Sequence, residues 1–427
     1  MERTDDGPSL TRDLALATWG LFVGLACLLL AAGLFGTLLG VRSELVGLPT
    51  VVSSLISASY YAGFLLGSRV ALSALGRVGH IRVYAALASM LSAAMLAVGL
   101  TDSAPAWAGL RFVTGLCLAG QYVVAESWLN NLATNENRGR LLAIYAVVTS
   151  GAFGLGQVML FAVNDATAVT GFAVASIITS LAVAPVALSE DAMAPSVEER
   201  EHISLRDLAR LVPTGVFSCL LVGIAHGALT GMAAIYATRV GMSAGQIGLF
   251  VAAPNIGGML LHWPVSAASD DVDRRAVGLL ASLSAIGAAA LLVFTPPTSP
   301  IALLFIAALG GFSYPLYSIA AAYTNDWIEP EHVNAAASQL VTLYGLGAVV
   351  GPLVAAGMMI VIGPKGYFWA AVVLHSMLAA FFLYRMRAWR APLTKRPWDE
   401  VSLPARVFFV PATVVAMGRR YRSKYVR

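Results

Sequence analysis

Arg111 places a guanidinium inside a long apolar segment, Ala104 to Ala125. In hydrocarbon an arginine costs at least ~2.5 kcal/mol on insertion scales, so it must face other helices or a wet cavity. Two kinds of chemistry are open to it. Arg111 hydrogen-bonds to carbonyls of the first apolar segment, or it contacts an anionic substrate or senses a proton.

Uncharged and weakly basic polar side chains also interrupt the apolar segments. They are Tyr60, Tyr61, Gln121, Gln157, His226, Asn255, His262, Tyr314, Tyr317, Gln339, Tyr344 and His375. For each one, a hydrogen bond between helices competes with contact to a ligand. The carboxylates lie at segment ends instead, so a group that titrates near neutrality at a segment centre must be a histidine, with His226 best placed.

Nothing in the sequence predicts an enzyme or a bound cofactor. It has no Walker-type glycine loop, and no nucleophile, base and orienting acid share a recognisable arrangement. Its three cysteines, Cys27, Cys117 and Cys219, all lie in apolar segments and have no spacing suited to zinc or a disulfide framework. We therefore expect no metal site, and we expect the cysteines to be small core residues.

The elements that must position these residues follow from composition. The 427 residues are 58% hydrophobic and only 12% charged, which a water-soluble fold could not accommodate. Twelve segments are long enough to cross a bilayer as helices, and they are too uniformly apolar for barrel strands. They are Leu14–Leu39, Leu48–Ser68, Val83–Leu100, Ala104–Ala125, Leu141–Val163, Ala166–Leu188, Leu211–Thr238, Ser243–Ser269, Ala276–Phe294, Ile301–Thr324, Val333–Ile362 and Tyr367–Tyr384. The predicted fold class is all-α and integral to the membrane, with 12 transmembrane helices.

The distribution of lysine and arginine predicts the orientation. If the N-terminus is cytoplasmic, the outer loops hold only Arg42, Arg239 and Lys365 of the 27 basic residues. Because positive loops stay on the cytoplasmic side, both termini are expected there, in the inner (plasma) membrane. No cleavable signal peptide is evident.

A short charged turn recurs after the second segment of each half. The stretch "LGRVGHIRV" aligns with "SDDVDRRAV", 194 positions later, so that Gly76 falls opposite Asp270 and His80 opposite Arg274. The repeat predicts two six-helix bundles related by pseudo-twofold symmetry, a form of duplication found in secondary transporters. We expect bundles at 1–188 and 211–387, a cytoplasmic linker at 189–210 and a basic cytoplasmic tail at 388–427.

These features resemble the major facilitator superfamily. Its loop signature between the second and third helices is matched at Arg77, Gly79 and Arg82, although Gly76 replaces the acidic residue. Arg111 with Gly115, "GAFGLGQ" and "GLGAVVGP" are further matches. The motifs "AESWLNN" and "GGFSYPLYSIAAAYTND" are similar to the YcaD-like group of bacterial facilitator proteins.

The resemblance implies a central cavity lined mainly by the first, fourth, seventh and tenth helices. It thereby selects a set of expected pocket residues, namely Arg111, Gln121, His226, Tyr314 and Tyr317, with Gln157 and Asn255 behind them. The chemistry of the partner is left open beyond a small-molecule substrate.

The charged turns could serve only to fix the orientation of the helices in the membrane. The same resemblance implies a second role, in which they pack against the other half and hold the cytoplasmic gate shut. The expected gate network is Arg77, Gly79, Arg82, Glu126, Arg138, Asp270, Arg274, Arg275 and Asp326. A partly buried carboxylate needs a cation, so Glu126 is expected to pair with Arg77 or Arg138. By the same reasoning Asp326 is expected to pair with Arg274 or Arg275.

The linker and tail have amphipathic and basic character. In the linker, which contains Pro195, the run from Ile203 to Leu211 predicts either an amphipathic helix under the membrane or a solvated tether. The tail segment "VFFVPATVVAM" followed by "GRRYRSKYVR" predicts attachment to anionic lipid rather than nucleic-acid binding. We expect a monomer.

Two functions remain open from sequence. The first is a secondary active transporter that moves a small organic solute by alternating access, with proton-coupled efflux or uniport as its energetics. The second is a non-transporting membrane scaffold or lipid-handling protein with the same fold.

Overall fold

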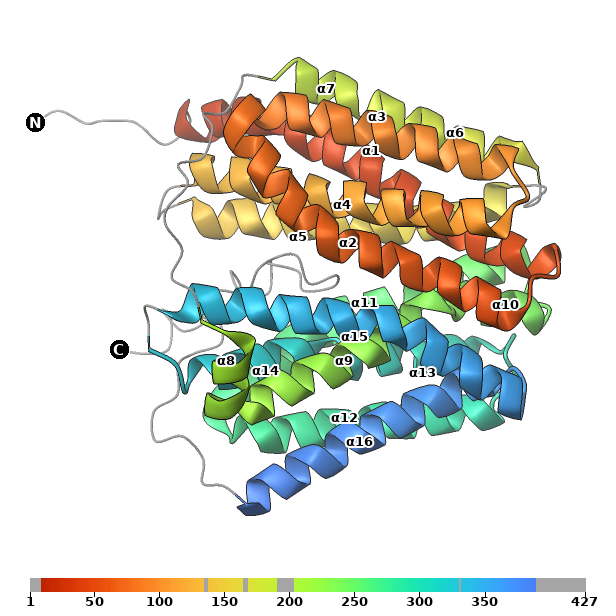
Figure 1. Ribbon diagram of the computed structural model, residues 1–427, viewed down its shortest axis with the longest axis vertical. Coiled ribbons are helices and arrows are strands. Elements are labelled where there is room, and N and C mark those ends of the chain that lie inside the picture. Colours follow the sequence, from red (N-terminus) through yellow and green to blue (C-terminus); the bar gives the residue numbers. More distant parts are fainter. Residues whose placement is uncertain (1–8, 134–136, 164–167, 190–202, 330–331, 389–427) are drawn as a thin grey trace, which may run out of the picture.

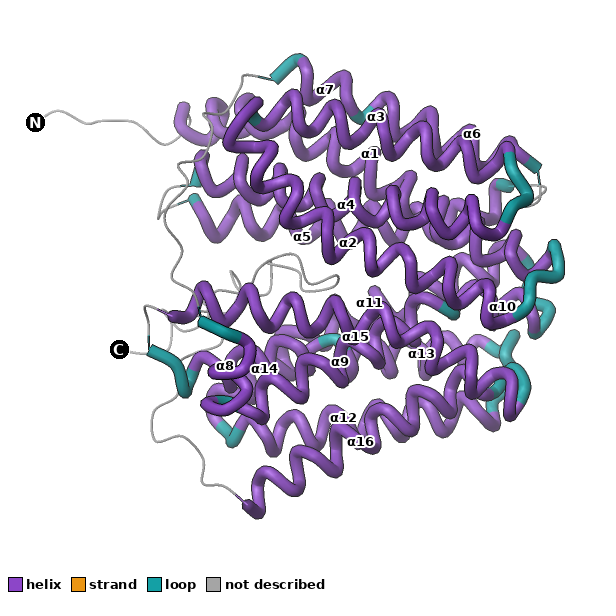
Figure 2. Tube along the Cα trace, in the orientation of Figure 1, coloured by secondary structure: helices purple, strands orange, loops and turns teal. Residues whose placement is uncertain are grey.

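The structure is a computed structural model that describes residues 9–133, 137–163, 168–189, 203–329 and 332–388. Within these residues helices are joined by short turns and no strand occurs (Figures 1 and 2). The helices are α1 (Ser9–Leu45), α2 (Thr50–Val78), α3 (His80–Leu100), α4 (Ala104–Leu132), α5 (Arg138–Val158), the 3-10 helix η1 (Met159–Ala162), α6 (Val169–Leu181), α7 (Val183–Ala187), α8 (Leu205–Leu211), α9 (Pro213–Gly231), α10 (Ala233–Arg239), α11 (Ala244–Asp271), α12 (Arg274–Phe294), α13 (Pro300–Ser313), α14 (Pro315–Asn325), α15 (Val333–Ile362) and α16 (Gly366–Ala388). Pro195 and the basic tail lie outside the described residues.

Twelve helical segments of the described chain are long and apolar enough to cross a membrane, as the sequence predicts. Four predicted spans change helix within their length: the fifth passes from α5 to η1 at Met159, the sixth from α6 to α7 at Ala182, and the seventh and tenth are interrupted as follows. The seventh breaks after Gly231 at Met232, where φ is −115° and ψ is 0°, so that α10 forms a separate short helix. The tenth changes helix at Tyr314, directly before Pro315, whose ring nitrogen donates no hydrogen bond.

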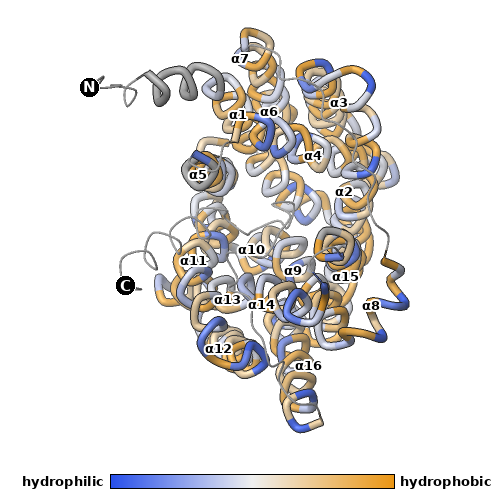
Figure 3. Tube along the Cα trace, turned by 90° about the vertical axis from the view of Figure 1, so that its left-hand side faces the viewer, coloured by the Kyte–Doolittle hydropathy of each residue, from blue (hydrophilic) through white to orange (hydrophobic). Residues whose placement is uncertain are grey.

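The helices form two groups, α1 to α7 and α9 to α16, stacked as two layers in Figure 1. α1 begins and α16 ends at the same side of the molecule, which we call the terminal end; the opposite side is the far end (Figure 1). Figure 3 looks onto the terminal end, where hydrophilic colour gathers at helix ends while the helix bodies are largely apolar. This distribution suits helices whose middle parts lie in lipid.

Close helix contacts repeat in the two groups. A Cβ on Gly63 of α2 would lie 1.9 Å from the carbonyl oxygen of Phe112 on α4, and a Cβ on Gly257 of α11 would lie 1.7 Å from that of Ala307 on α13. Gly257 is the repeat-related position of Gly63. Glycine lets the two backbones touch at both places, which supports the predicted duplication.

The repeated turns at the terminal end are built differently. Gly79 joins α2 to α3 with φ 84°, a left-handed conformation that favours glycine. At the related position Asp273 begins α12, and its side chain accepts a hydrogen bond from the backbone N–H of Arg275. One turn therefore depends on glycine and the other on a side-chain cap.

The linker forms a short helix packed on the second group. α8 buries Leu208 in the cluster around α9, while Leu205 and Leu211 remain exposed. The side chain of Gln339 on α15 donates to the carbonyl oxygen of Ile203 at 3.1 Å. The end of the linker is thus fastened to the second group rather than free of it.

Candidate functional site: a cavity between the two halves

A cavity lies where the two groups of helices meet, and helices of both groups line it. Its lining comes from α1, α2, α4 and α5 of the first group and from α9, α10 and α11 of the second. Its empty volume is about 970 Å³, which includes space open to solvent. Among the described lining residues Arg111 is charged and none is acidic. A largely apolar wall that carries a few placed polar groups is typical of small-molecule sites.

Arg111 lies on α4 against two aromatic rings. The guanidinium carbon is 4.4 Å from the ring centre of Tyr60 on α2 and 5.4 Å from that of Phe35 on α1. Gly36 leaves room beside it, because a Cβ there would lie 3.4 Å from Nη2. The expected hydrogen bonds to carbonyls of the first span are not found in the described part of the chain, where stacking on aromatic faces positions the cation instead.

Hydroxyl groups cross the cavity from one half to the other. Ser57 on α2 donates to the carbonyl oxygen of Gly231 at 2.9 Å, where α9 ends. One turn further along α2, the hydroxyl oxygens of Tyr61 and Thr230 are 2.5 Å apart. The Ser57 bond uses the carbonyl oxygen at the break between α9 and α10, so the interruption of the seventh span creates part of the site.

Gln157 and Asn255 form a second polar contact between the halves. Gln157 lines the cavity, and its Oε1 accepts a hydrogen bond from Nδ2 of Asn255 at 2.9 Å. Asn255 in turn accepts from the hydroxyl of Tyr314 at 3.4 Å. Of the residues expected in the pocket, Arg111 and Gln157 line the cavity and Asn255 touches its wall.

The remaining expected pocket residues lie away from this cavity, within one half. Gln121 donates to the carbonyl oxygen of Tyr84 at 2.9 Å, inside the first group. His226 is buried between the Tyr344 hydroxyl, 2.9 Å from Nδ1, and the Ser313 carbonyl oxygen, 3.1 Å from Nε2.

Tyr314 packs edge-on against the His226 ring, and Tyr317 is buried in the cluster around α9 and α14. These residues were expected in the pocket because the seventh and tenth helices were expected to line the cavity along their whole length. In the structure α9 contributes only its last residues and the described part of α14 contributes none.

Tyr60, Tyr61, Ser53 and Ser57 of α2 are lining residues that the pocket selection left out. The two tyrosines stood among the intramembrane polar groups of the sequence. A signal for all four was present, because their spacing places them on one face of a helix. That face was overlooked because the second helix was not expected to form the wall.

The gate residues of the first half are described only in part. Arg77 and Arg82 are exposed, and the described residues contain no ion pair between Arg77 and Glu126. Glu126 instead accepts a hydrogen bond from the Tyr145 hydroxyl at 3.3 Å. The side chain of Arg138 lies outside the described part, so that pairing is untested. Arg77 is exposed, and the expected pairing of Glu126 with Arg77 or Arg138 stays a prediction.

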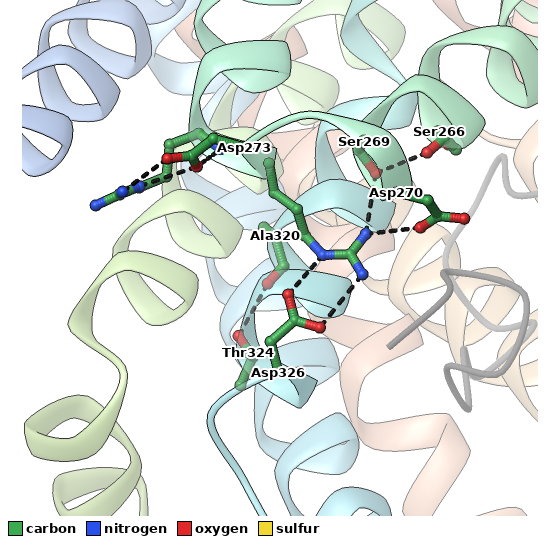
Figure 4. Close-up of polar contacts among 9 residues, drawn as sticks. Ser266, Ser269, Asp270, Asp273, Ala320, Thr324 and Asp326 are labelled. Carbon is green, nitrogen blue, oxygen red and sulfur yellow. Dashed lines mark hydrogen bonds and ion pairs between the residues drawn. The ribbon is translucent and has the colours of Figure 1, made fainter. Parts of the chain in front are cut away.

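In the second half the gate residues do form a compact network at the terminal end (Figure 4). Nε of Arg274 is 2.7 Å from Oδ2 of Asp326, and Nη1 is 3.1 Å from Oδ1 of Asp270. The side chains of Arg274 and Asp326 are 1% and 0% exposed. Arg275 binds Asp273 through Nη2 at 2.7 Å. The predicted pairing of Asp326 with Arg274 is confirmed, and the contacts named in this paragraph lie within the second half.

His80 holds the corresponding place in the first half. It is fully buried, and its Nε2 lies 3.0 Å from the hydroxyl of Ser127 on α4. The repeat-related residue Arg274 likewise contacts another helix of its own half, through Asp326 at the end of α14. The alignment of the two turns contained this correspondence, although His80 was not among the expected gate residues.

An ion pair between the halves lies at the far end. Arg239, the last residue of α10, donates to both carboxylate oxygens of Glu44 near the end of α1, at 2.7 and 2.6 Å, and to the Thr50 hydroxyl at 3.1 Å. From sequence, Arg239 is expected in an outer loop, and Glu44 is one of the carboxylates at segment ends. A signal was available, because Glu44 and Arg239 lie at nearly equivalent positions of the repeat.

Comparisons with known proteins agree with this architecture. Residues 215–421 match the family model described as Major Facilitator Superfamily. The chain is 30% identical over 344 residues to the uncharacterized MFS-type transporter YcaD of Salmonella arizonae, covering 79% of this chain and 88% of that one. Its counterpart in Escherichia fergusonii is 29% identical over the same shares.

Solved structures resemble the fold at low sequence identity. A mutant of the nucleoside transporter NupG aligns with a TM-score of 0.72 at 10% identity, covering 88% of this chain and all of that one. A bacterial homologue of the human lysosomal transporter Spinster, in an inward-facing and occupied conformation, aligns with a TM-score of 0.69 at 15% identity, covering 88% of this chain and 98% of that one.

Proposed function

We propose, from the premise that this chain belongs to the major facilitator superfamily and is a membrane transporter, that it carries a small organic solute by alternating access. The cavity between the halves is the proposed solute site. The observation that carries the proposal is the composition of the cavity wall, to which both repeat-related halves contribute polar groups. A site at such an interface changes its exposure when the halves rock against each other.

The polar contacts between the halves support a particular state. Described contacts of this kind join Arg239 to Glu44, Ser57 to Gly231 and Tyr61 to Thr230, all at or toward the far end, and they join Gln157, near the end of α5, to Asn255. At the terminal end, the described contacts of Arg274 with Asp326 and of Glu126 with Tyr145 each lie within one half. From the contacts between the halves we infer a state that is closed at the far end.

Orientation and energetics complete the proposal. Both termini are proposed to be cytoplasmic, in the inner membrane, because the basic residues concentrate at that end. The far end is then extracellular. Proton-coupled efflux stays the proposed mode, with a monomer of two bundles, 1–188 and 211–387, working in contact with lipid.

The experiment is a solute screen in proteoliposomes that hold the purified full-length protein. Uptake and efflux of small organic solutes are measured with and without a pH gradient, beside liposomes without protein. Saturable, protein-dependent flux supports the transporter, and its dependence on the gradient supports coupling. Absence of flux for every solute, in protein that remains folded, would instead favour the alternative of a membrane scaffold or lipid-handling protein.

A further inference from the structure

We propose that the cavity binds a small organic monoanion, such as a carboxylate, whose charged group contacts the guanidinium of Arg111. This inference rests on the proposed function, because it names the substrate class of the same cavity. It does not depend on the direction of transport or on proton coupling. Three observations carry it. Arg111 has no acceptor among the described residues, hydroxyl and apolar groups surround it, and it is the single charged residue of the described lining.

Arg111 is half-buried, and it differs from the other buried or half-buried arginines named below in having no hydrogen-bond acceptor among the described residues. Nη2 of Arg42 lies 2.8 Å from Asp102, and Nε of Arg274 lies 2.7 Å from Asp326. An acceptor also lies beside three further arginines: Glu44 beside Arg239, Asp273 beside Arg275 and Thr214 beside Arg385. The guanidinium of Arg111 has neither a carboxylate within 4.0 Å nor a hydrogen bond to an acceptor among the described residues. Its contacts are the two aromatic faces.

A guanidinium that stacks on an aromatic ring uses its flat face and leaves its N–H edge available. In a low-dielectric cavity those donors are costly unless an acceptor meets them. The described lining supplies no carboxylate for this purpose. A bound anion is the partner that satisfies both the charge and the N–H groups, through paired charge-assisted hydrogen bonds.

The surroundings fit an organic anion rather than a hydrated inorganic one. Ser53 also lines the cavity and is 1% exposed, and its hydroxyl oxygen has no hydrogen-bond partner among the residues that the structure describes. Ser57 and Tyr61 add further hydroxyls across the site. Ile56 and Phe153 give the wall apolar surface for the rest of the solute. Such a wall suits a molecule with one polar end and an apolar body.

The charge of the site selects among anions. One guanidinium neutralises one negative charge, and the described lining contains no second lysine or arginine. A dianion such as phosphate would retain a net negative charge in a low-dielectric site, which is unfavourable. A monocarboxylate leaves the site neutral. The proposed class is therefore small monocarboxylates, and neutral analogues and phosphate are excluded from tight binding.

The test measures binding by thermal stabilisation of the purified full-length protein, read from tryptophan fluorescence. Acetate, hexanoate, benzoate and phenylacetate are each compared with the corresponding amide and with inorganic phosphate. At least one carboxylate should raise the melting temperature in a saturable way while its amide and phosphate do not. The proposal is overturned if no carboxylate stabilises the protein more than its own amide does.

Variants test the role of the residue. Arg111→Gln should weaken carboxylate binding by about tenfold to a hundredfold, the loss typical of a charge-assisted hydrogen-bond pair. Arg111→Lys keeps the charge but not the paired donors, so it should bind with intermediate affinity. Arg69→Gln, at an exposed position outside the cavity, is the matched control and should bind as the wild type does. Equal binding by wild type and Arg111→Gln contradicts the proposal.

The comparison of carboxylate with amide uses only the wild-type protein, so the test holds even where Arg111→Gln fails to fold. The outcome also separates this inference from the proposed function. Carboxylate binding without any flux would contradict the proposed transport function but not the anion site. Flux of neutral or cationic solutes that is unchanged in Arg111→Lys would contradict the anion site but not the transport function.

Discussion

Replacing Arg274 by methionine should destabilise the protein more than any change to its acidic neighbours. Arg274 donates to Asp326 from Nε at 2.7 Å and from Nη2 at 3.3 Å, and it also reaches Ser269 at 3.0 Å and Asp270 at 3.1 Å (Figure 4). It thereby joins the ends of α11, α12 and α14. Because the Asp326 side chain is fully buried, its carboxylate stays desolvated when the guanidinium is removed.

The expected magnitude follows from burial. Removing one partner of a buried ion pair costs about 3–5 kcal/mol, because the other charge stays desolvated. Asp270→Asn should cost about 1 kcal/mol or less, because Asp270 is partly exposed and Arg274 keeps Asp326. The double variant Arg274→Met/Asp326→Leu removes both charges. It should recover roughly 2 kcal/mol or more relative to Arg274→Met alone.

The assay is the free energy of unfolding of each variant in mixed micelles, followed by circular dichroism and arranged as a double-mutant cycle. A coupling energy of about 2–4 kcal/mol between Arg274 and Asp326 is expected. The reasoning is refuted if Arg274→Met costs less than about 1 kcal/mol. It is also refuted if the double variant loses the sum of the two single changes.

Two further changes test other contacts. Glu44→Gln removes the charge that Arg239 binds at the far end. Loss of this contact, at about 1.5 kcal/mol, should shift the balance of states toward far-end opening roughly tenfold. Spin-label distances across that end measure the shift, and exchanging the two charges should reverse it. Gly257→Ala should lower the melting temperature, at a cost of about 1–3 kcal/mol, because its Cβ would overlap the Ala307 carbonyl oxygen. Gly287→Ala, where no atom lies within 4 Å, should not lower it.

The fold could be predicted because the physical signals are long and repeated. Twelve apolar segments leave few alternatives in lipid, and the recurrence of the charged turn places the duplication. The helix breaks could not be predicted with the same ease. Pro315 marks one break, but Met232 has no side-chain property that ends a helix, so the break after Gly231 depends on tertiary packing.

The site was predicted in part, and the reason differs between residues. Arg111 was identified from its cost in hydrocarbon, and Asp326 with Arg274 from the need of a buried carboxylate for a cation. His226 was assigned to the pocket by its helix, whereas its ring faces Tyr344 within one half. Which face of a helix meets the cavity depends on the packing of both halves, and intramembrane polarity alone does not specify it.

Alternating access is tested most directly by distances at both ends of one molecule. Spin labels at the exposed positions Val78 and Val272 report the terminal end, and labels at Val46 and Lys365 report the far end. As solute and pH are varied, conditions that shorten the terminal-end distance should lengthen the far-end distance. A single unchanged distance at each end, or changes of the same sign at both ends, would contradict the rocking of two halves around the cavity.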